Sequence, residues 1–184
     1  MRWMGLAWAV FFAPFVWNHL RVRRERHKDG SVERRVDRAP VSNQGLLLQF
    51  ASIGLAFAAG GELRLWLLPW ALAMSAGATL LSGWALVHLG RQWRIQAVVA
   101  EDHRLVTSGP YSIVRHPVYL ALLLMLVATL LVRSNWWSAL VSLAGYLGGT
   151  EIRVRAEEGL LRARFRSEFE AFAARTFAYL PGLR

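Results

Sequence analysis

Uncharged apolar blocks alternate with short polar segments along the chain. Five blocks contain no Asp, Glu, Lys or Arg, and they cover residues 3–17, 46–61, 65–89, 118–132 and 136–150. An α-helix rises 1.5 Å per residue, so about 20 apolar residues cross the hydrocarbon layer of a bilayer. Only 65–89 is that long, and the other blocks, of 15 or 16 residues, need flanking tryptophan and arginine side chains to reach the headgroups. The pattern predicts an all-α, polytopic integral membrane protein with about five transmembrane helices.

The order of the blocks divides the chain into two parts. Residues 1–90 contain three predicted transmembrane helices and a basic cytoplasmic loop at 19–44. Residues 91–184 contain a predicted helical hairpin at 118–150 and a cytoplasmic amphipathic tail helix at 151–176. The short blocks of the hairpin are compatible with two thin spans or with a hairpin that dips into the bilayer and returns.

The basic residues predict the orientation in the membrane. Lys and Arg are retained on the cytoplasmic side, and nineteen of the 22 lie in the segments 19–44, 90–116 and 151–184. The N-terminus is therefore expected outside and the C-terminus in the cytoplasm, in a bacterial inner membrane. The first block is interpreted as a retained anchor, because Asn18, His19 and several arginines follow it instead of a small-residue cleavage site.

Composition fits this division of the chain. The sequence is 55% hydrophobic yet has a formal net charge of +10, a combination that separate apolar and basic segments explain. The topology and anionic membrane lipids account for the basic balance, so no nucleic-acid partner is expected. There are no cysteines, and the five histidines do not lie at metal-ligand spacings, so no metal site is expected.

One candidate site precedes the fourth apolar block. Arg115, His116 and Pro117 lie at the predicted start of a helix, and Tyr111 and Tyr119 flank them. Proline is favoured in the first turn of a helix, and a helix N-terminus beside positive side chains attracts anions. The alternative is an ordinary basic flank with an interfacial tyrosine.

The predicted tail helix carries a second candidate site. Glu158 lies in the middle of its apolar stripe and Glu157 on the flank of that stripe. A carboxylate that faces a buried side is costly unless it is paired, which indicates a partner such as Arg115 or a bound cation. The alternative is a surface glutamate paired along the helix with Arg155 or Arg162.

These segments carry a family resemblance. The chain resembles the isoprenylcysteine carboxyl methyltransferases, a family of membrane methyltransferases whose wider group includes phospholipid N-methyltransferases. The resemblance covers the C-terminal half, and its motifs are Leu105-Val106-Thr107-Ser108-Gly109-Pro110-Tyr111, Val114-Arg115-His116-Pro117-Val118-Tyr119, Arg155-Ala156-Glu157-Glu158 and Tyr179-Leu180-Pro181.

The resemblance implies a function and a set of site residues. It implies transfer of a methyl group from S-adenosyl-L-methionine to a lipophilic acceptor, such as an isoprenylcysteine-like carboxylate, a thiol or a lipid. By the same resemblance, the catalytic residues are Arg115 and Glu158, and the cofactor-binding residues are Tyr111, His116, Pro117, Tyr119, Glu157 and Glu158.

The chain departs from the family pattern at three points that concern the acceptor. Ala121 stands where the family often has glycine, and Phe169 and Phe172 stand where a Phe-Gly-x-x-Tyr-x-x-Tyr pattern has tyrosines. The two lost hydroxyls imply a less polar or differently held acceptor.

Two other functions compete with this interpretation. An NADPH-dependent reductase of the related sterol-reductase type has a similar C-terminal layout, and Arg91, Arg94 and Arg104 are its candidate phosphate ligands. A non-catalytic membrane scaffold with the same fold would bind no such cofactor.

Overall fold

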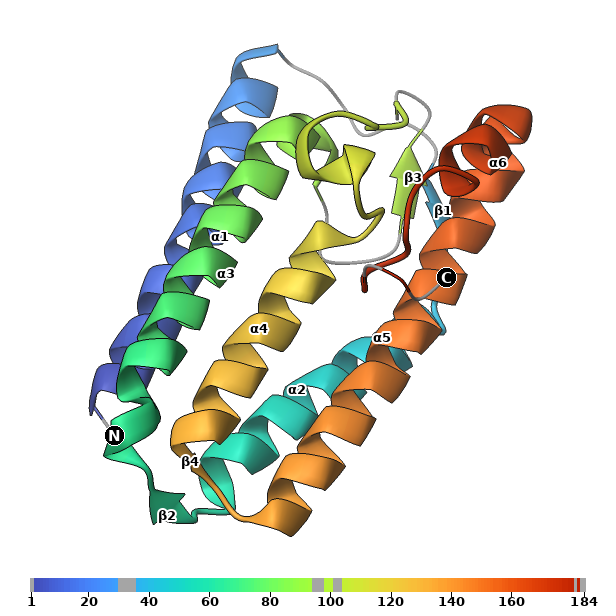
Figure 1. Cartoon of the computed structure of the whole chain (residues 1–184). Coiled ribbons are helices and arrows are strands. Elements are labelled where there is room, and N and C mark those ends of the chain that lie inside the picture. Colours follow the sequence, from blue (N-terminus) through green and yellow to red (C-terminus); the bar gives the residue numbers. More distant parts are fainter. Residues whose placement is uncertain (1, 30–35, 94–97, 101–103, 181, 183–184) are drawn as a thin grey trace.

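The computed structural model describes residues 2–29, 36–93, 98–100, 104–180 and 182. The fold is mostly helical, as predicted, with two sheets of two short strands each (Figure 1). The elements are, in order, α1 (Arg2–Asp29), β1 (Val36–Arg38), α2 (Ser42–Ala58), β2 (Glu62–Leu63), α3 (Leu68–Leu89), β3 (Val98–Ala100), α4 (Pro117–Val132), β4 (Arg133–Ser134), α5 (Trp136–Phe165) and α6 (Ser167–Ala173). Short 3₁₀ turns precede α3, follow it, and occupy Gly109–Ser112.

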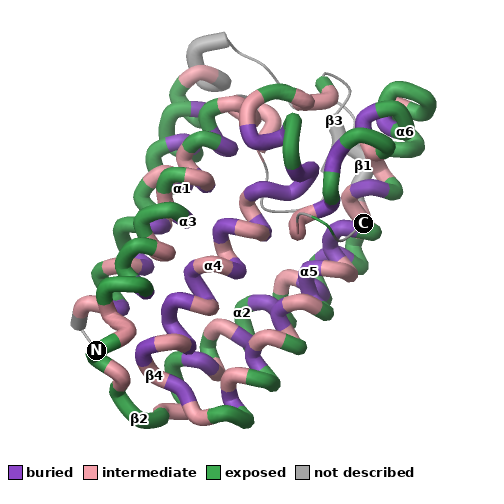
Figure 2. The backbone as a smooth tube through the Cα atoms, in the orientation of Figure 1, coloured by how far each residue is buried: buried purple, intermediate pink, exposed green. Residues whose placement is uncertain are grey.

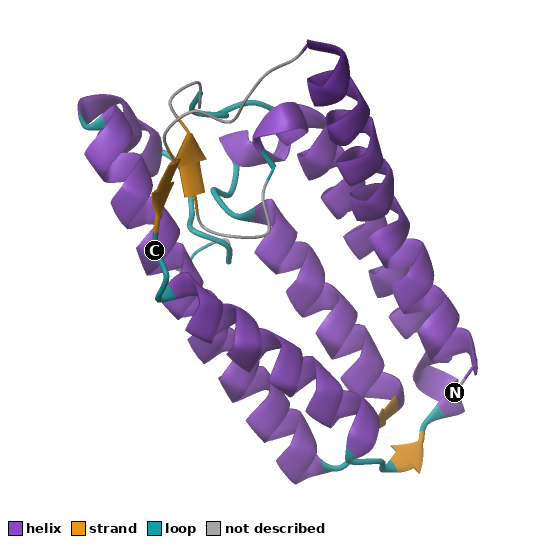
Figure 3. Cartoon of the chain, turned by 180° about the vertical axis from the view of Figure 1, so that it is seen from behind, coloured by secondary structure: helices purple, strands orange, loops and turns teal. Residues whose placement is uncertain are grey.

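The long helices form two pairs with α4 between them. Helix α3 packs against both α1 and α4, and α2 packs along α5 (Figure 1). The small sheets lie at opposite ends of the bundle, where β1 pairs with β3 at one end and β2 with β4 at the other (Figure 3). The described turn at 104–116 and α6 lie at the β1–β3 end, which is the predicted cytoplasmic end.

The predicted hairpin at 118–150 is present as α4 and the first half of α5. Pro117 begins α4, as expected for a residue without an N–H group. The chain reverses through β4, and the Asn135 side chain caps α5 by accepting a hydrogen bond from the Ser138 N–H at 2.9 Å.

The predicted loop at 19–44 is wrong over its first part, because α1 continues to Asp29. Arginine and glutamate are good helix formers, and the ion pair between Arg21 and Glu25 at 2.8 Å supports the extension. The rest of the predicted loop contains β1 and the first turn of α2, while residues 30–35 lie outside the described residues.

The predicted tail helix at 151–176 is wrong at both ends. Helix α5 runs without interruption from Trp136 to Phe165, so the fifth apolar block and the start of the tail form one helix. It ends at Arg166, whose φ of 46° breaks the helical path before α6. The segment 176–178 is extended and forms no part of a helix.

Helices α2 and α5 approach closely through small residues. A Cβ atom on Gly45 would lie 2.5 Å from the Gly149 carbonyl oxygen, and one on Gly149 would lie 2.6 Å from the Gly45 carbonyl oxygen. The buried residues of α2 are small or polar: Ser42, Gly45, Gln49, Ser52 and Ala56. Figure 2 shows that buried positions along α2 alternate with intermediate and exposed ones. Small residues let helix backbones pack closely in membranes.

Among the described residues, one helical stretch is long and apolar enough to cross a bilayer. It is Leu65–Leu89, with 25 residues. The helix Pro117–Val132 is apolar but shorter. Large apolar side chains are exposed on the outer faces of the bundle, including Trp66, Trp70, Leu80 and Trp136. The prediction of about five spans stays a prediction.

Candidate functional site

The segment before α4 is bound by the extended segment 176–178, called the C-terminal strap below. The Arg115 N–H donates to the Phe177 carbonyl, and the His116 N–H donates to the Ala178 carbonyl, each at 2.8 Å. Ala178 packs between Tyr119 of α4 and Val154 of α5. The strap therefore fixes the backbone that presents Arg115 and His116.

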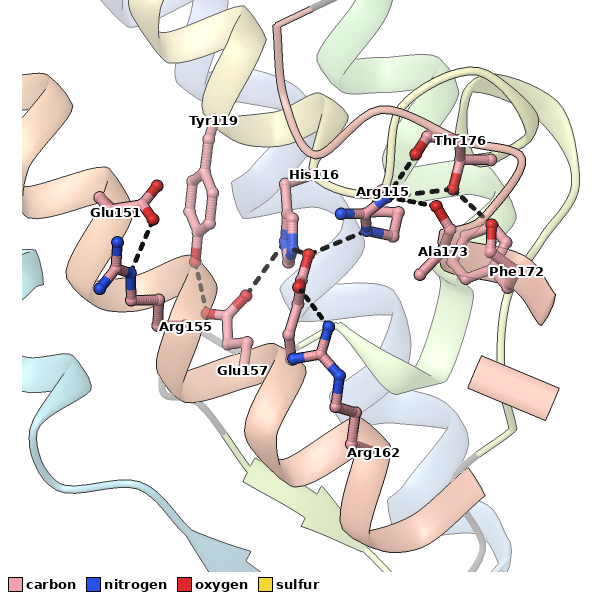
Figure 4. A network of polar contacts seen from close by, with 11 residues as sticks. Arg115, His116, Tyr119, Glu151, Arg155, Glu157, Arg162, Phe172, Ala173 and Thr176 are labelled. Atoms are coloured by element: carbon pink, nitrogen blue, oxygen red, sulfur yellow. Dashed lines mark hydrogen bonds and ion pairs between the residues drawn. The ribbon is translucent and has the colours of Figure 1, made fainter. Parts of the chain in front are cut away.

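Arg115 is buried, and its Nε and Nη1 atoms donate to protein groups (Figure 4). Its Nε donates to Glu158 Oε1 at 2.8 Å. Its Nη1 donates to the Ala173 carbonyl at 3.2 Å and to the Thr176 carbonyl. The predicted partnership of Arg115 with Glu158 is confirmed, and it joins the start of α4 to the half of α5 that lies toward the β1–β3 end of the bundle.

His116 lies between the two glutamates (Figure 4). Its Nδ1 is 3.4 Å from Glu157 Oε2, and its Nε2 is 3.5 Å from Glu158 Oε1. The imidazole stacks on the Tyr119 ring with centroids 5.5 Å apart, and the Tyr119 hydroxyl donates to Glu157 Oε1. Residues about forty positions apart in the chain thus form one cluster.

Arg153 belongs to this cluster and was missed by the sequence analysis. Its Nε donates to the Tyr119 hydroxyl at 2.8 Å, and its Nη2 lies 3.2 Å from Glu157 Oε1. The residue is 3% exposed. The signal that could have found it is its position four residues before Glu157 on a helix.

The charges in the cluster shift one another's protonation. Burial raises the pKa of Glu158, but hydrogen bonds from His116 and Arg115 lower it to about 2. Burial likewise opposes ionisation of Glu157, whose pKa is nevertheless lowered by His116 and Arg153. Burial lowers the pKa of His116, but the two glutamates raise it above its usual value. Burial and the charge of Glu157 raise the pKa of Tyr111.

A cavity of about 300 Å³ opens beside the cluster. Most of the sequence-predicted site residues line it, namely Tyr111, Arg115, His116, Pro117, Tyr119 and Glu157. Glu158 is not part of the wall. It lies behind the wall and contacts Arg115, His116 and, at 3.4 Å, Arg162. The predicted pairing of Glu158 along the helix is thus also present.

The side of the cavity away from the cluster is apolar. Phe12 and Phe15 reach it from α1, and Leu46 and Phe50 from α2. Gln49 is the polar residue that α2 adds to the wall. The wall thus combines charged groups with aromatic and other apolar groups, a combination that fits an amphiphilic ligand.

The residues that depart from the family pattern are either buried or, at one position, have an unusual backbone conformation. Ala121 is in the core formed with α1 and α3. Phe169 and Phe172 pack against Tyr111, and Phe172 also lines the cavity. Arg166 occupies the glycine position of the tail pattern and has a positive φ.

Only some of the arginines that were candidate phosphate ligands for NADPH lie among the described residues. Arg104 lines the cavity and is exposed. Arg94 lies outside the described residues, as does Pro181 of the terminal motif. Among the residues that the structure describes, no group of three or more His, Asp or Glu side chains could hold a metal ion.

Comparison with known proteins adds a family match and two relatives. Residues 71–163 match the isoprenylcysteine carboxyl methyltransferase (ICMT) family. Over 103 residues the chain is 35% identical to the cobalt-zinc-cadmium resistance protein CzcN of Cupriavidus metallidurans and 33% identical to the nickel-cobalt-cadmium resistance protein NccN of Alcaligenes xylosoxydans xylosoxydans. Each match covers 55% of this chain and 47% of the relative, so the chain spans about half the length of these proteins.

Proposed function

Because the chain belongs to the isoprenylcysteine carboxyl methyltransferase family of membrane methyltransferases, we propose that it transfers a methyl group from S-adenosylmethionine to a lipophilic acceptor. The observation that carries the proposal is the convergence of Arg115 and His116 with Glu157 and Glu158 beside one cavity. The family match covers both pairs of residues.

The wall residues fit the chemical groups of the cofactor. The cationic Arg115 and His116 suit its carboxylate, Glu157 and the Tyr111 hydroxyl suit its amine and ribose, and the apolar wall suits its adenine. Pro117 and Tyr119 shape the wall beside them. When bound, the cofactor supplies an electrophilic methyl group on a sulfonium.

The residues of this chain contribute position and charge. An atom of the acceptor would provide the electron pair for the new bond to the methyl carbon, while the bond from that carbon to sulfur breaks and its electron pair stays on the sulfur of the departing S-adenosylhomocysteine. No covalent protein nucleophile is required. Glu158 holds Arg115 and His116 in place from behind the wall, and Arg153 and Tyr119 hold Glu157. Fixed charges around the reacting groups lower the barrier because they need no reorganisation.

The acceptor is proposed to be amphiphilic: an isoprenylcysteine-like carboxylate, a thiol or a lipid. Phe12, Phe15 and Phe50 line the end of the cavity next to α1 and α2, and Phe50 is half exposed on the outer face of α2. The acceptor would reach the cavity sideways from the bilayer. Turnover confined to freely water-soluble acceptors, and indifferent to lipid or detergent, would contradict sideways entry.

The setting of the reaction is proposed from the basic residues. The cavity lies at the cytoplasmic face of a bacterial inner membrane, with the N-terminus outside and the C-terminus in the cytoplasm. Anionic membrane lipids would contact the exposed arginines of α1, such as Arg21, Arg23 and Arg24. A role in metal resistance, as in the names of the two relatives, would then be indirect, through methylation of a membrane component.

The decisive test uses detergent-purified protein and two ligands in separate calorimetric titrations. S-adenosylhomocysteine is expected to bind and NADPH is not. Binding of NADPH alone would favour the reductase, and binding of neither ligand would favour the scaffold. A chain that binds S-adenosylhomocysteine is then assayed with methyl-labelled cofactor and membrane extracts, where label is expected in the lipid-soluble fraction.

A further inference from the structure

Gln49 is an unusual residue in the wall of the cavity. It comes from α2, outside the residues 71–163 that match the family, and it is 3% exposed. The other residues of α2 that line the cavity, Leu46 and Phe50, are apolar. A glutamine in such surroundings is costly unless all its polar atoms are hydrogen-bonded.

Only one end of the Gln49 amide has a protein partner. Its Nε2 donates to Thr150 Oγ1 of α5 at 2.8 Å. Within the described part of the chain, its carbonyl oxygen accepts no hydrogen bond, although the Gln49 side chain borders the cavity. This oxygen is not among the fully buried side-chain atoms that lack a partner, so it has access to the space of the cavity that Gln49 lines, where it is available to a hydrogen-bond donor on a ligand.

The close packing of α2 and α5 fixes where this carbonyl lies. Gly45 and Gly149 bring the two backbones together one turn away from Gln49, and the space for a Cβ on Gly149 is bounded by Gln49 Cγ at 3.1 Å. A Cβ on Gly45 would lie 2.8 Å from Arg153 Cγ. Gln49 therefore lies beside Gly149 and Thr150, about one helical turn of α5 from Arg153 of the charged cluster.

We propose that Gln49 determines acceptor specificity by accepting a hydrogen bond from an N–H or O–H group that joins the polar head of the methyl acceptor to its apolar tail. This inference rests on the proposed function and adds the class of acceptor. The polar head of the acceptor lies toward Arg153 and Glu157, and its tail lies along Phe12, Phe15 and Phe50. Gln49 takes no part in cofactor binding.

The test compares two probes that differ by one group. N-decanoylglycine has an amide N–H between its tail and its carboxylate, and decanoyloxyacetic acid has an ester oxygen at the same place. Each probe is titrated calorimetrically into detergent-purified protein, with and without saturating S-adenosylhomocysteine. Wild-type protein is expected to bind the amide about three- to tenfold more tightly, the size of one neutral hydrogen bond.

Gln49→Met keeps the length of the side chain and removes the carbonyl, so the preference for the amide should fall to about one. Ser52→Ala is the matched control, because Ser52 lies on the same buried stripe of α2 but outside the cavity wall and donates to the Leu48 carbonyl. It should keep the wild-type preference. Thr150→Val, which frees the amide to turn, should reduce the preference while leaving Gln49 in place.

Three results would overturn the proposal: no preference in the wild type, the same preference in Gln49→Met, or binding of neither probe. Failure of the methyltransferase function has a different signature. In that case S-adenosylhomocysteine would not bind to any variant, while the titrations without it would still report on Gln49. A Gln49→Met protein that loses S-adenosylhomocysteine affinity would instead assign Gln49 to the cofactor.

Discussion

Glu158 has no exposed surface, yet it is separated from the cavity by the residues that it holds. Its carboxylate joins Arg115 of the α4 start, His116 and Arg162. Removal of one member of a buried ion pair costs more than the pair contributes, because the other charge is left without its counterion. Glu158 therefore controls the geometry of the wall without forming the wall.

Glu158→Gln keeps the shape of the side chain and removes its charge. The affinity for S-adenosylhomocysteine is expected to fall by roughly 10- to 150-fold, because a lost charge-assisted hydrogen bond costs about 1.5–3 kcal/mol. Isothermal titration calorimetry measures this change.

The control for general damage to α5 is Arg155→Gln. Arg155 is exposed, and its ion pair within the described residues is along the helix surface with Glu151, at 2.7 Å, so little loss is expected. Arg162 would be a poor control, since it contacts both Glu158 and Glu170. Equal affinities in Glu158→Gln and wild type, in folded and monodisperse protein, would remove Glu158 from the site.

The loss of a proton from His116 is expected to lower the stability of the folded protein as the pH rises. Its pKa is raised above 6.5 because the attraction of Glu157 and Glu158 exceeds the effect of burial. The resulting stabilisation is complete below pH 6.5 and is lost as the pH rises through the raised value. The lowered pKa of Glu158, about 2, has the opposite sign, so its contribution is present above its ordinary value and is lost as the solution is acidified toward pH 2.

The melting temperature of the purified protein should therefore decline as the pH rises above 6.5. In His116→Gln, whose side chain does not titrate, most of this decline should be absent. Tryptophan fluorescence during heating reports both curves. Parallel curves for the two proteins across this range would show that His116 does not titrate in it.

The polar pairs of the site were predictable in part. Arg115 and Glu158 could be matched from sequence because each is a charge next to apolar positions, and such a charge needs a counterion. Arg153 could not be found in the same way. It was counted as one of many cytoplasmic arginines, and its contact with Tyr119 arises only when α4 and α5 are brought together.

At the scale of elements, the junction of α5 and α6 contains backbone strain. Arg166 has φ 46° and ψ −116°, a region that glycine enters freely and that other residues occupy at a cost of order 1–3 kcal/mol. Arg166 is exposed, and its N–H still bonds the Arg162 carbonyl at 3.0 Å. The side chain therefore gains little that would offset the strain.

Arg166→Gly is expected to stabilise the protein by about 1 kcal/mol, since relief of strain exceeds the entropy that glycine adds to the unfolded chain. Reversible denaturation in mixed micelles measures the change. Arg164→Gly is the companion variant. It lies within the last turn of α5, where glycine should destabilise by up to about 1 kcal/mol. Destabilisation by both substitutions would contradict the strain at Arg166.

The apolar pattern predicted which segments are helical better than it predicted where the helices end. Each apolar block is helical, but α1 and α5 continue through charged segments that were expected to begin new elements. Charged residues indicate that a segment is exposed to water, but they do not end a helix. Neither 18–29 nor 151–165 contains proline, which would end one. The true end of α5 depends on Arg166, a residue type that normally continues a helix.

At the scale of the whole molecule, the bundle has two chemically distinct ends. The β2–β4 end has exposed tryptophans such as Trp66 and Trp136. The β1–β3 end has the ion-pair cluster and the cavity. Which of the two ends faces the cytoplasm stays a prediction from the basic residues.

Single cysteines provide a clean test of the orientation because the chain has none of its own. Asn43→Cys and Ser167→Cys, both at exposed positions toward the cluster end, should react with a membrane-impermeant maleimide only after the inner membrane is opened. Glu62→Cys, at an exposed position of β2, should react in intact spheroplasts. Labelling of Asn43→Cys and Ser167→Cys from opposite sides would contradict the topology.

The C-terminal strap also dictates when the site can exist during biosynthesis. The Thr176 carbonyl that accepts from Arg115 is made 61 positions after that arginine, and the carbonyls of Phe177 and Ala178 come later still. A nascent chain that has already formed α4 and α5 therefore holds Arg115 and His116 without their backbone partners. The ribosome must have made the residues up to Ala178 before this wall can close, so a chain stalled upstream of Thr176 would lack the carbonyl groups that fix Arg115 and His116.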